Sequence, residues 1–426
     1  MVKKFLIAFV CMVAQGLFAQ NGTISPYSYF GIGDLRTSGT VDNQMMGGMA
    51  MYADSIHINL QNPAAYSKLR LTTYTAGISH TENRLKDWTE EQRISVTNLD
   101  YLAIAFPVAN KVGVGFGLMP LSSVGYSLRD ETSTGTGSMV TNVYSGEGGL
   151  NRIYISVGFE PFKNVSLGAT VNYNFGTLEY QRIQSVEDVQ FGTLDNRESR
   201  INGYDFNYAL NYTPTIKDKY TLFTSVRVNT QGNLVSKNSQ RLGSFSLVTG
   251  DDIEVIDVDL DATNRRNTEL KIPTRTTVGL GFGEDKKWFM GGEYSFQQFS
   301  DFENTFLGLE NVTYNDASTY AFGGYWVPDY RSLSSYFKRV TYRAGVRYDL
   351  SGLEVNNKEI NNFGITFGLG LPMGGLNYES AFSNLNIGFE LGRRGTTDAA
   401  LIEESYFKVN VGLSLNARWF RKRKID

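Results

Sequence analysis

Residues 405–420 alternate strictly between apolar and polar side chains. The apolar positions run from Phe407 to Trp419, and the positions between them, from Lys408 to Arg418, carry polar or small residues. Successive side chains of a β-strand point to opposite faces. One wholly apolar face over this length is typical of a strand that separates lipid from a polar lumen, so the segment predicts a transmembrane β-barrel.

The same period of two recurs along the chain, most clearly in residues 153–159, 206–212, 220–228 and 385–391. We predict an all-β protein, a barrel of about fourteen antiparallel transmembrane strands that covers residues 71–420, and an even number is usual in bacterial barrels. The predicted strands are 71–80, 98–107, 112–128, 149–160, 163–183, 199–213, 219–232, 271–284, 287–302, 315–328, 338–350, 361–373, 382–394 and 405–420.

Short and long connections alternate between these strands. Residues 107–111, 160–163, 214–219 and 284–287 form short connections, whereas the longest polar stretch is 233–270. Outer-membrane barrels have short turns in the periplasm and long loops outside. The order therefore places both ends of the barrel in the periplasm.

The composition agrees with a barrel. Hydrophobic residues make up 41% and the mean hydropathy is −0.25, as expected where half of each strand faces water. The chain has no long apolar run after its N-terminus, so we expect no transmembrane helix. Removing Lys3 and Lys4 takes the formal charge from −3 to about −5, which argues against a nucleic-acid partner. Nothing in the composition implies a cofactor.

Residues 1–19 resemble a secretory signal peptide. Lys3 and Lys4 precede a mostly apolar stretch, which ends at the small residue Ala19. Cys11, the only cysteine, lies within this stretch behind a valine, which disfavours lipidation. Cleavage after Ala19 would leave no thiol or disulfide chemistry. We expect the mature protein in the outer membrane of a Gram-negative bacterium.

Residues 20–70 lack sustained alternation and precede the first strand. They either hang in the periplasm or fold into the barrel as a hatch, that is, a plug in the lumen. A fourteen-stranded barrel is wider than the eight-stranded barrels that their own side chains fill. We therefore predict the hatch.

The chain resembles the FadL-type family of outer-membrane transporters (FadL/TodX-like channels for hydrophobic compounds). The family's glycine-rich hatch leads to an Asn-Pro-Ala motif before the first strand, and this motif is the most specific part of the resemblance. The matching segments here are 25–34, 46–50, Asn62-Pro63-Ala64, Pro273-Thr274-Arg275 and the Lys/Arg-rich end 419–424.

The resemblance implies passive uptake of hydrophobic small molecules such as long-chain fatty acids, with release through a lateral gap after the hatch moves. On this reading the protein is a monomer whose partners are such ligands and outer-membrane lipid. Residues 129–149 depart from the family, because they are polar where apolar loops would capture ligand. The alternative function is an accessory barrel, a subunit of an outer-membrane secretion or assembly complex. Fold alone does not separate these roles.

Four methionines, Met45, Met46, Met49 and Met51, are candidate ligand contacts, because flexible thioethers adapt to varied apolar chains. They could equally pack the hatch against the wall.

Asn62, Pro63 and Ala64 are candidates for the hinge of the hatch, since proline fixes the local backbone. The alternative is a static turn into the first strand.

Arg339, Arg343 and Arg347 are spaced four apart, which predicts one lumenal face of a strand. Arg343 and Arg347 are candidate ligands for a carboxylate headgroup through bidentate hydrogen bonds. The favoured alternative is ion pairing with acids such as Glu390 or Asp34.

Other chemistry finds little support. The acidic residues in 251–261 match no calcium loop, and their alternation with aliphatic residues predicts a solvated hairpin. The basic tail 421–426 could contact lipid headgroups or a partner, or be a solvated periplasmic tail. His57 and His80 are the only histidines, so we expect neither a metal site nor catalysis.

Overall fold

The computed structural model describes residues 22–36, 39–133, 137–302, 304, 306–307, 311–373 and 383–417. The predicted signal peptide, the basic tail and Trp419 lie outside these residues, so what was predicted for them stays a prediction.

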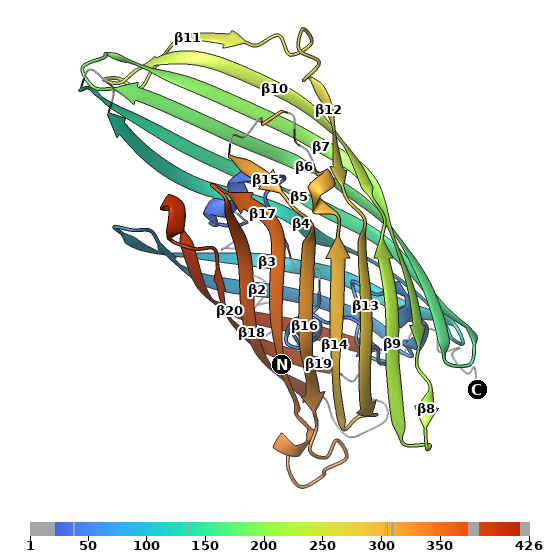
Figure 1. The fold of residues 1–426 in the computed structure, drawn as a ribbon. Coiled ribbons are helices and arrows are strands. Elements are labelled where there is room, and N and C mark those ends of the chain that lie inside the picture. Colours follow the sequence, from blue (N-terminus) through green and yellow to red (C-terminus); the bar gives the residue numbers. More distant parts are fainter. Residues whose placement is uncertain are drawn as a thin grey trace, which may run out of the picture.

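Fourteen antiparallel strands of the described chain form a closed wall, paired in chain order (Figure 1). The last strand pairs with the first, from Ala417 opposite Thr72 to Glu403 opposite Lys86, and this pairing closes the barrel. The wall strands are β2 (Thr72–Lys86), β3 (Glu91–Ala109), β4 (Val112–Ser133), β5 (Met139–Phe162), β6 (Val165–Val186), β7 (Phe191–Tyr212), β9 (Tyr220–Asn229), β13 (Arg275–Glu284), β14 (Trp288–Gln297), β16 (Ala317–Trp326), β17 (Thr341–Val355), β18 (Lys358–Met373), β19 (Ser383–Arg394) and β20 (Glu403–Ala417).

The predicted all-β fold and all fourteen predicted strand positions are confirmed, but several strands are longer than predicted. The stretch 129–149, expected as a polar loop, belongs largely to β4 and β5, and 233–270 contains three strands. Beyond the membrane both faces of a hairpin meet water, so the apolar alternation that marks a strand in the sequence disappears there. The additional strands are β8 (Thr215–Ile216), β10 (Gly232–Ser246), β11 (Asp252–Asp257), β12 (Asn267–Ile272) and β15 (Val312–Tyr314).

The wall is much taller on one side. β5, β6 and β7 have 22 to 24 residues, whereas β9, β13, β14 and β16 have ten. β10 extends the wall above β9 by pairing with β7, and β12 pairs with β10 (Figure 1). The tall part rises on the side where the long loops were expected.

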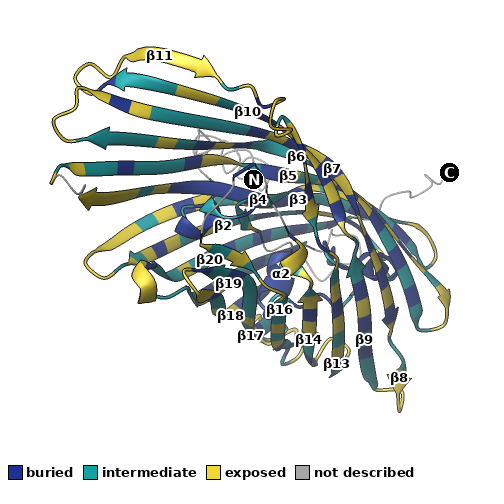
Figure 2. Ribbon diagram, turned by 45° about the horizontal axis from the view of Figure 1, so that its top comes forward, coloured by how far each residue is buried: buried dark blue, intermediate teal, exposed yellow. Residues whose placement is uncertain are grey.

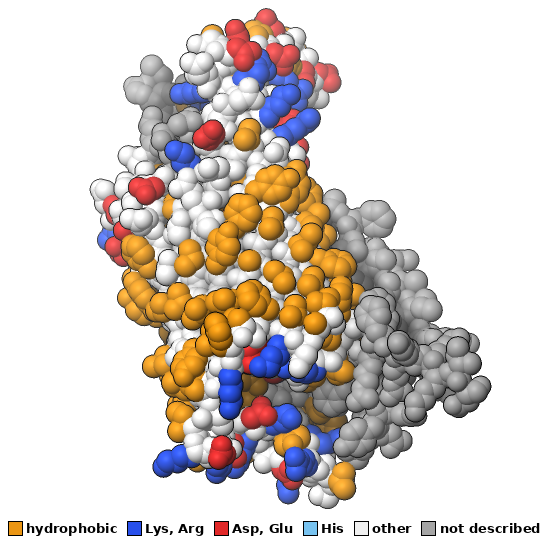
Figure 3. All heavy atoms as spheres, turned by 90° about the vertical axis from the view of Figure 1, so that its right-hand side faces the viewer, with side chains coloured by type: hydrophobic (Ala, Val, Ile, Leu, Met, Phe, Trp, Pro, Cys, Tyr) orange, Lys and Arg blue, Asp and Glu red, His pale blue; other side chains and the backbone are white. Residues whose placement is uncertain are grey.

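The alternation predicted from the sequence sets the two faces of the wall. In β7, Phe206, Tyr208 and Leu210 are exposed, whereas Asn207 and Asn211 are buried in the interior. Burial alternates in the same way along the other strands (Figure 2). Apolar side chains gather in a band around the middle of the outer face, with charged residues above and below it (Figure 3). This is the distribution expected of a wall that meets lipid.

Residues 22–70, hereafter the N-terminal segment, pack against the inner side of the wall through short elements. These are η1 (Pro26–Tyr29), β1 (Asp34–Leu35), α2 (Val41–Gln44) and η2 (Pro63–Lys68). Three further short helices lie in connections of the barrel: η3 (Phe299–Asp301), η4 (Phe337–Arg339) and η5 (Asp398–Ala400). None of the described helices is long and apolar enough to cross a membrane.

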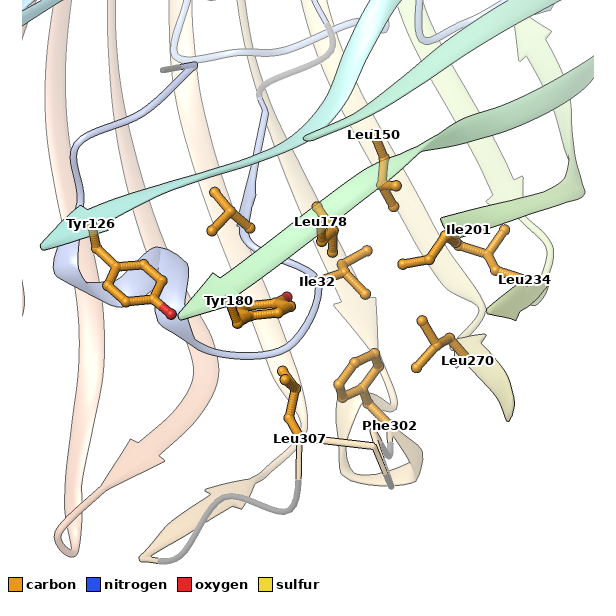
Figure 4. Packing of buried hydrophobic residues seen from close by; sticks show 11 residues of the cluster. Ile32, Tyr126, Leu150, Leu178, Tyr180, Ile201, Leu234, Leu270, Phe302 and Leu307 are labelled. Atoms are coloured by element: carbon orange, nitrogen blue, oxygen red, sulfur yellow. The ribbon is translucent and has the colours of Figure 1, made fainter. Parts of the chain in front are cut away.

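The inner face of the tall part is apolar. Leu150, Leu178 and Leu234 on its strands pack with Ile32 of the N-terminal segment and with Phe302 of the β14–β15 connection (Figure 4). Packed apolar side chains therefore occupy part of the upper lumen.

Candidate functional site

The N-terminal segment touches the wall through backbone as well as side chains. Gly47 has φ +73° and its N–H donates to Thr366 Oγ1 over 3.1 Å. A Cβ added to Gly345 on β17 would lie 2.2 Å from the Gly47 nitrogen. Only glycines permit this approach. The segment therefore rests on the wall with no space for a ligand between these two residues.

The Asn-Pro-Ala motif caps η2 and is packed against β5 and β6. Asn62 is fully buried, accepts from the Ala64 N–H over 3.2 Å and donates to Asn211 Oδ1 over 3.1 Å. A Cβ on Gly168 would lie 2.2 Å from the Pro63 carbonyl carbon. The geometry explains why asparagine precedes proline here, because its side chain satisfies a free N–H at the helix start. The role as a hinge stays a prediction.

All four predicted methionines are buried at the inner wall. Met45 lies against Gly368 and Gly388, while Met46, Met49 and Met51 pack with aromatic residues of the barrel. They do not border the lumenal cavity described below. Ligand contact by these methionines therefore stays a prediction that would require the N-terminal segment to move.

The predicted arginines engage polar partners. Arg347 Nη2 lies 3.0 Å from Glu390 Oε1, and its Nε lies 2.8 Å from Asp349 Oδ2. Arg343 donates to Asn386 Oδ1 over 3.0 Å. The expected ion pair with Glu390 is thus present in the structure. Headgroup binding by Arg343 and Arg347 remains a prediction.

Two details of the arginine prediction are wrong. Arg339 is not on the strand: β17 begins at Thr341, and Arg339 ends η4, where its guanidinium lies over the Tyr336 ring. Asp34 pairs with Arg394 over 2.7 Å and not with the predicted arginines. β17 starts later than predicted because residues 327–340 belong to the loop that connects it to β16.

The N-terminal segment is tethered to the β19–β20 region by residues that the sequence analysis did not single out. Besides the Asp34–Arg394 pair, Ser25 hydrogen-bonds to Glu404, and the Tyr27 hydroxyl donates to the Ile402 carbonyl over 2.6 Å. The alternation that places Asn386 and Glu390 inward, continued to the end of β19, would have placed Arg394 inward as well.

A second tether involves Asn384, near the start of β19. His57 Nδ1 is 2.6 Å from Asp54 Oδ2, and Nε2 is 3.3 Å from the Asn384 amide. Burial disfavours the imidazolium, but the carboxylates of Asp54 and Asp42 outweigh burial and raise the pKa of His57 above its usual value. Burial would raise the pKa of the Asp54 carboxyl, whereas the interactions with His57 lower it. These interactions outweigh burial, so the pKa of Asp54 lies below its usual value.

The lumen holds a cavity of about 380 Å³ bordered by charged and aromatic residues. Its polar part includes the Arg152–Asp205 pair, at 2.7 Å, and the buried Arg227–Glu293 pair. Arg275 also borders it and donates to Thr319 Oγ1 over 3.1 Å. The aromatic part contains Phe30, Phe299, Phe302 and Tyr314. The cavity lining thus combines aromatic side chains with buried ion pairs.

The wall has a seam between β3 and β4. Their pairing runs from Ala109–Val112 to Leu102–Leu118 and goes no further, although both strands continue. Pro120 on β4 has no N–H to offer a neighbour. β1 occupies part of this edge by pairing with Ser122 and Ser123 of β4. The seam is thus an interruption of the wall that the N-terminal segment partly covers.

Residues 327–340, between β16 and β17, form a loop that exposes large apolar side chains, at the end of the barrel expected in the periplasm. Leu333 is 80% exposed and Phe337 is 73% exposed. The loop is braced by the Asp329 N–H, which donates to the Lys338 carbonyl over 2.8 Å, and by the Tyr342 hydroxyl, which donates to the Phe337 carbonyl over 3.2 Å. A loop that is held by hydrogen bonds and exposes apolar side chains is a candidate contact surface.

A closed fourteen-stranded barrel with a segment packed against its inner wall defines a barrel of the FadL type. Solved structures with this fold include the toluene transporter TodX of Pseudomonas putida (TM-score 0.58, 15% identity, 92% of this chain and 100% of that chain). They also include the toluene transporter TbuX of Ralstonia pickettii (0.57, 12%, 89% and 98%) and a FadL homologue of Pseudomonas aeruginosa (0.56, 11%, 92% and 100%).

The chain belongs to the BamG family, whose model matches residues 1–426. No curated protein matches it. The predicted FadL-type fold is therefore confirmed, while the identities to the transporters are too low to carry over their activity.

Proposed function

We propose that this protein is an accessory barrel, a subunit of a complex that assembles or secretes proteins at the outer membrane of a Gram-negative bacterium. The observation that carries the proposal is the charged lining of the lumenal cavity. Arg152–Asp205 and Arg227–Glu293 border the cavity, and so does Arg347, which pairs with Glu390. An apolar molecule in this part of the lumen would displace water from charged groups and offer them no hydrogen bond in return, which is unfavourable.

Two further observations support the accessory role. The first is membership of the BamG family. The second is the braced periplasmic loop 327–340, which offers Leu333 and Phe337 to a partner. In this proposal the N-terminal segment is a hatch that stiffens the barrel, and Met45, Met46, Met49 and Met51 pack it against the wall.

Depletion of the protein in its native host tests the proposal. An assembly subunit predicts that the folded amounts of unrelated outer-membrane barrels fall together, measured by quantitative proteomics of purified outer membranes. A Leu333→Ser/Phe337→Ser variant that folds normally should reproduce part of this loss. Unchanged amounts of all other barrels after depletion would refute the assembly role.

A second candidate function is the passive uptake of hydrophobic small molecules such as long-chain fatty acids. The β3–β4 seam specifically favours it, because an interrupted ladder offers a lateral way into the lipid. Arg343 and Arg347 would then meet a carboxylate headgroup, and Asn62-Pro63-Ala64 would act as the hinge. Uptake of labelled oleate into cells that contain or lack the protein tests this candidate, which fails if the two rates are equal.

A further inference from the structure

The tall part of the wall ends in an edge strand, β11, that pairs with no described strand on its outer side. β11 pairs with β10 from Asp257 opposite Arg241 to Asp252 opposite Phe245, with a bulge near Ser244 (Figure 1). Residues 246–272 are all described, and none of them pairs with the other edge of β11.

Hydrogen-bond positions show which peptide groups of β11 are free. The Val258 N–H donates to the Gln240 carbonyl over 2.9 Å. In an antiparallel ladder the bonded positions recur every second residue. The N–H and C=O groups of Val255 and Asp257 therefore point away from β10. They form the start of a ladder that another strand can continue.

The side chains of β11 combine exposed aliphatic residues with acidic ones. All six are exposed, and they include Ile253 (56%), Val255 (45%) and Ile256 (57%). Edge strands are often protected by charged residues, proline, bulges or short length. The acidic residues and the bulge of β11 oppose pairing with a like-charged strand, but aliphatic surface stays uncovered beside free peptide groups.

The charges select the partner. Asp252, Glu254 and Asp257 lie on β11, and within residues 251–261 only Asp261 has an ion pair, with Arg266 at 2.7 Å. Among the described residues no group of acidic side chains is arranged to hold a metal ion. Antiparallel pairing of β11 with a second copy would bring two sets of the same three carboxylates onto one ladder, and like charges close together are destabilising. The edge thus disfavours itself and favours a cationic strand.

We propose that the outer edge of β11 binds an extended segment of another polypeptide, with basic residues alternating with aliphatic ones, on the extracellular side. Main-chain hydrogen bonds to Val255 and Asp257 would supply affinity, and the carboxylates would select basic side chains. This inference rests on the proposed accessory role, because it names a surface that a partner subunit would use.

A synthetic peptide of alternating lysine and valine, with the glutamate–valine peptide as its counterpart, tests the edge directly on the full-length protein in detergent. We expect saturable binding of the lysine peptide, weakened by salt, and no binding of the glutamate peptide. Amide exchange at Val255 and Asp257 should slow when the lysine peptide binds.

Two variants at one position separate strand addition from simple charge attraction. Val255→Pro removes an outward N–H and should weaken the lysine peptide about tenfold, the loss expected for one main-chain hydrogen bond. Val255→Ile keeps the N–H and should bind normally. Equal binding by Val255→Pro and Val255→Ile would overturn strand addition.

A second pair of variants tests the selection by charge. Asp257→Asn should weaken binding of the lysine peptide, whereas Asp261→Asn should not, because the Asp261 carboxylate already pairs with Arg266.

Purification from the native membrane distinguishes failure of this inference from failure of the proposed function. If Val255→Pro retains every partner of the unsubstituted protein, the β11 inference fails and the accessory role stands. If the unsubstituted protein has no partner, the accessory role fails, while peptide binding still decides whether β11 accepts a strand.

Discussion

The Arg347 guanidinium bridges two carboxylates inside the barrel, with Nη2 3.0 Å from Glu390 Oε1 and Nε 2.8 Å from Asp349 Oδ2. Arg347 and Asp349 lie on β17, whereas Glu390 lies on β19. Because β18 lies between these two strands, the Arg347–Glu390 pair joins strands that are not neighbours. Because the arginine is nearly buried, its charge depends on both partners.

Glu390→Gln should destabilise the barrel by about 1–3 kcal/mol, because Arg347 keeps Asp349 but loses its second carboxylate. Urea unfolding in lipid vesicles, followed by tryptophan fluorescence, measures the change. Glu198→Gln breaks the exposed Arg200 pair and should cost less than about 1 kcal/mol. Equal losses in the two variants would contradict the importance of the lumenal pair.

Gly345→Ala should displace the N-terminal segment. The new methyl group would lie 2.2 Å from the Gly47 nitrogen, so one backbone must move. We expect faster amide exchange at Gly47 and a destabilisation of about 1–3 kcal/mol. Gly292→Ala is the matched control, since its methyl group would meet nothing closer than 3.5 Å. Protection at Gly47 that is unchanged in Gly345→Ala would show that the contact is not tight.

The His57–Asp54 pair predicts a pH window for the attachment of the N-terminal segment. The raised pKa of His57 gives stability that is full below its usual value of 6.5 and is lost as pH rises through the higher folded value. The lowered pKa of Asp54 gives stability that is full above 3.8 and is lost as pH falls through the lower folded value.

The protection factors of amide exchange at residues 54–57, which correct for the intrinsic rise of exchange with pH, should therefore be highest between these limits and fall at higher pH. His57→Gln should remove the alkaline change and leave other regions unaltered. A flat pH profile in the unsubstituted protein would disprove the linkage.

A disulfide between the N-terminal segment and the wall separates the two candidate functions. The hydroxyl oxygens of Ser67 and Ser166 are 2.9 Å apart, and Cys11 is the only native cysteine. The oxidised Ser67→Cys/Ser166→Cys variant should support normal amounts of other outer-membrane barrels, because an accessory barrel needs no hatch movement. A channel would lose uptake on oxidation and regain it on reduction. Loss of barrel assembly on oxidation alone would contradict a static hatch.

Much of the wall could be predicted because lipid imposes a pattern on the sequence. The alternation around Asn410 and Asn416 placed both residues in the interior, where the structure has them. It also placed Arg347 and Glu390 inside, so their pairing could be proposed. Where the wall leaves the membrane this constraint ends, and β11 could be expected only as a hairpin in a loop.

Contacts of the N-terminal segment could not be predicted in detail. The approach of Gly47 to Gly345 depends on how an irregular segment lies in the lumen. Such a segment has no periodic pattern of apolar and polar residues from which its position could be predicted. The choice of Arg394 as the partner of Asp34 depends on the same placement. The resemblance to the FadL-type family predicted the fold of the barrel correctly, but it did not determine the function of the protein.

Purification from the native outer membrane in mild detergent, followed by mass spectrometry of bound proteins and lipids, tests the central claim most directly. If the protein is an accessory barrel, a protein partner should copurify reproducibly in fixed stoichiometry, with no tightly bound hydrophobic ligand. A solitary barrel that carries one fatty acid or similar molecule per chain would contradict the accessory role and make uptake the function.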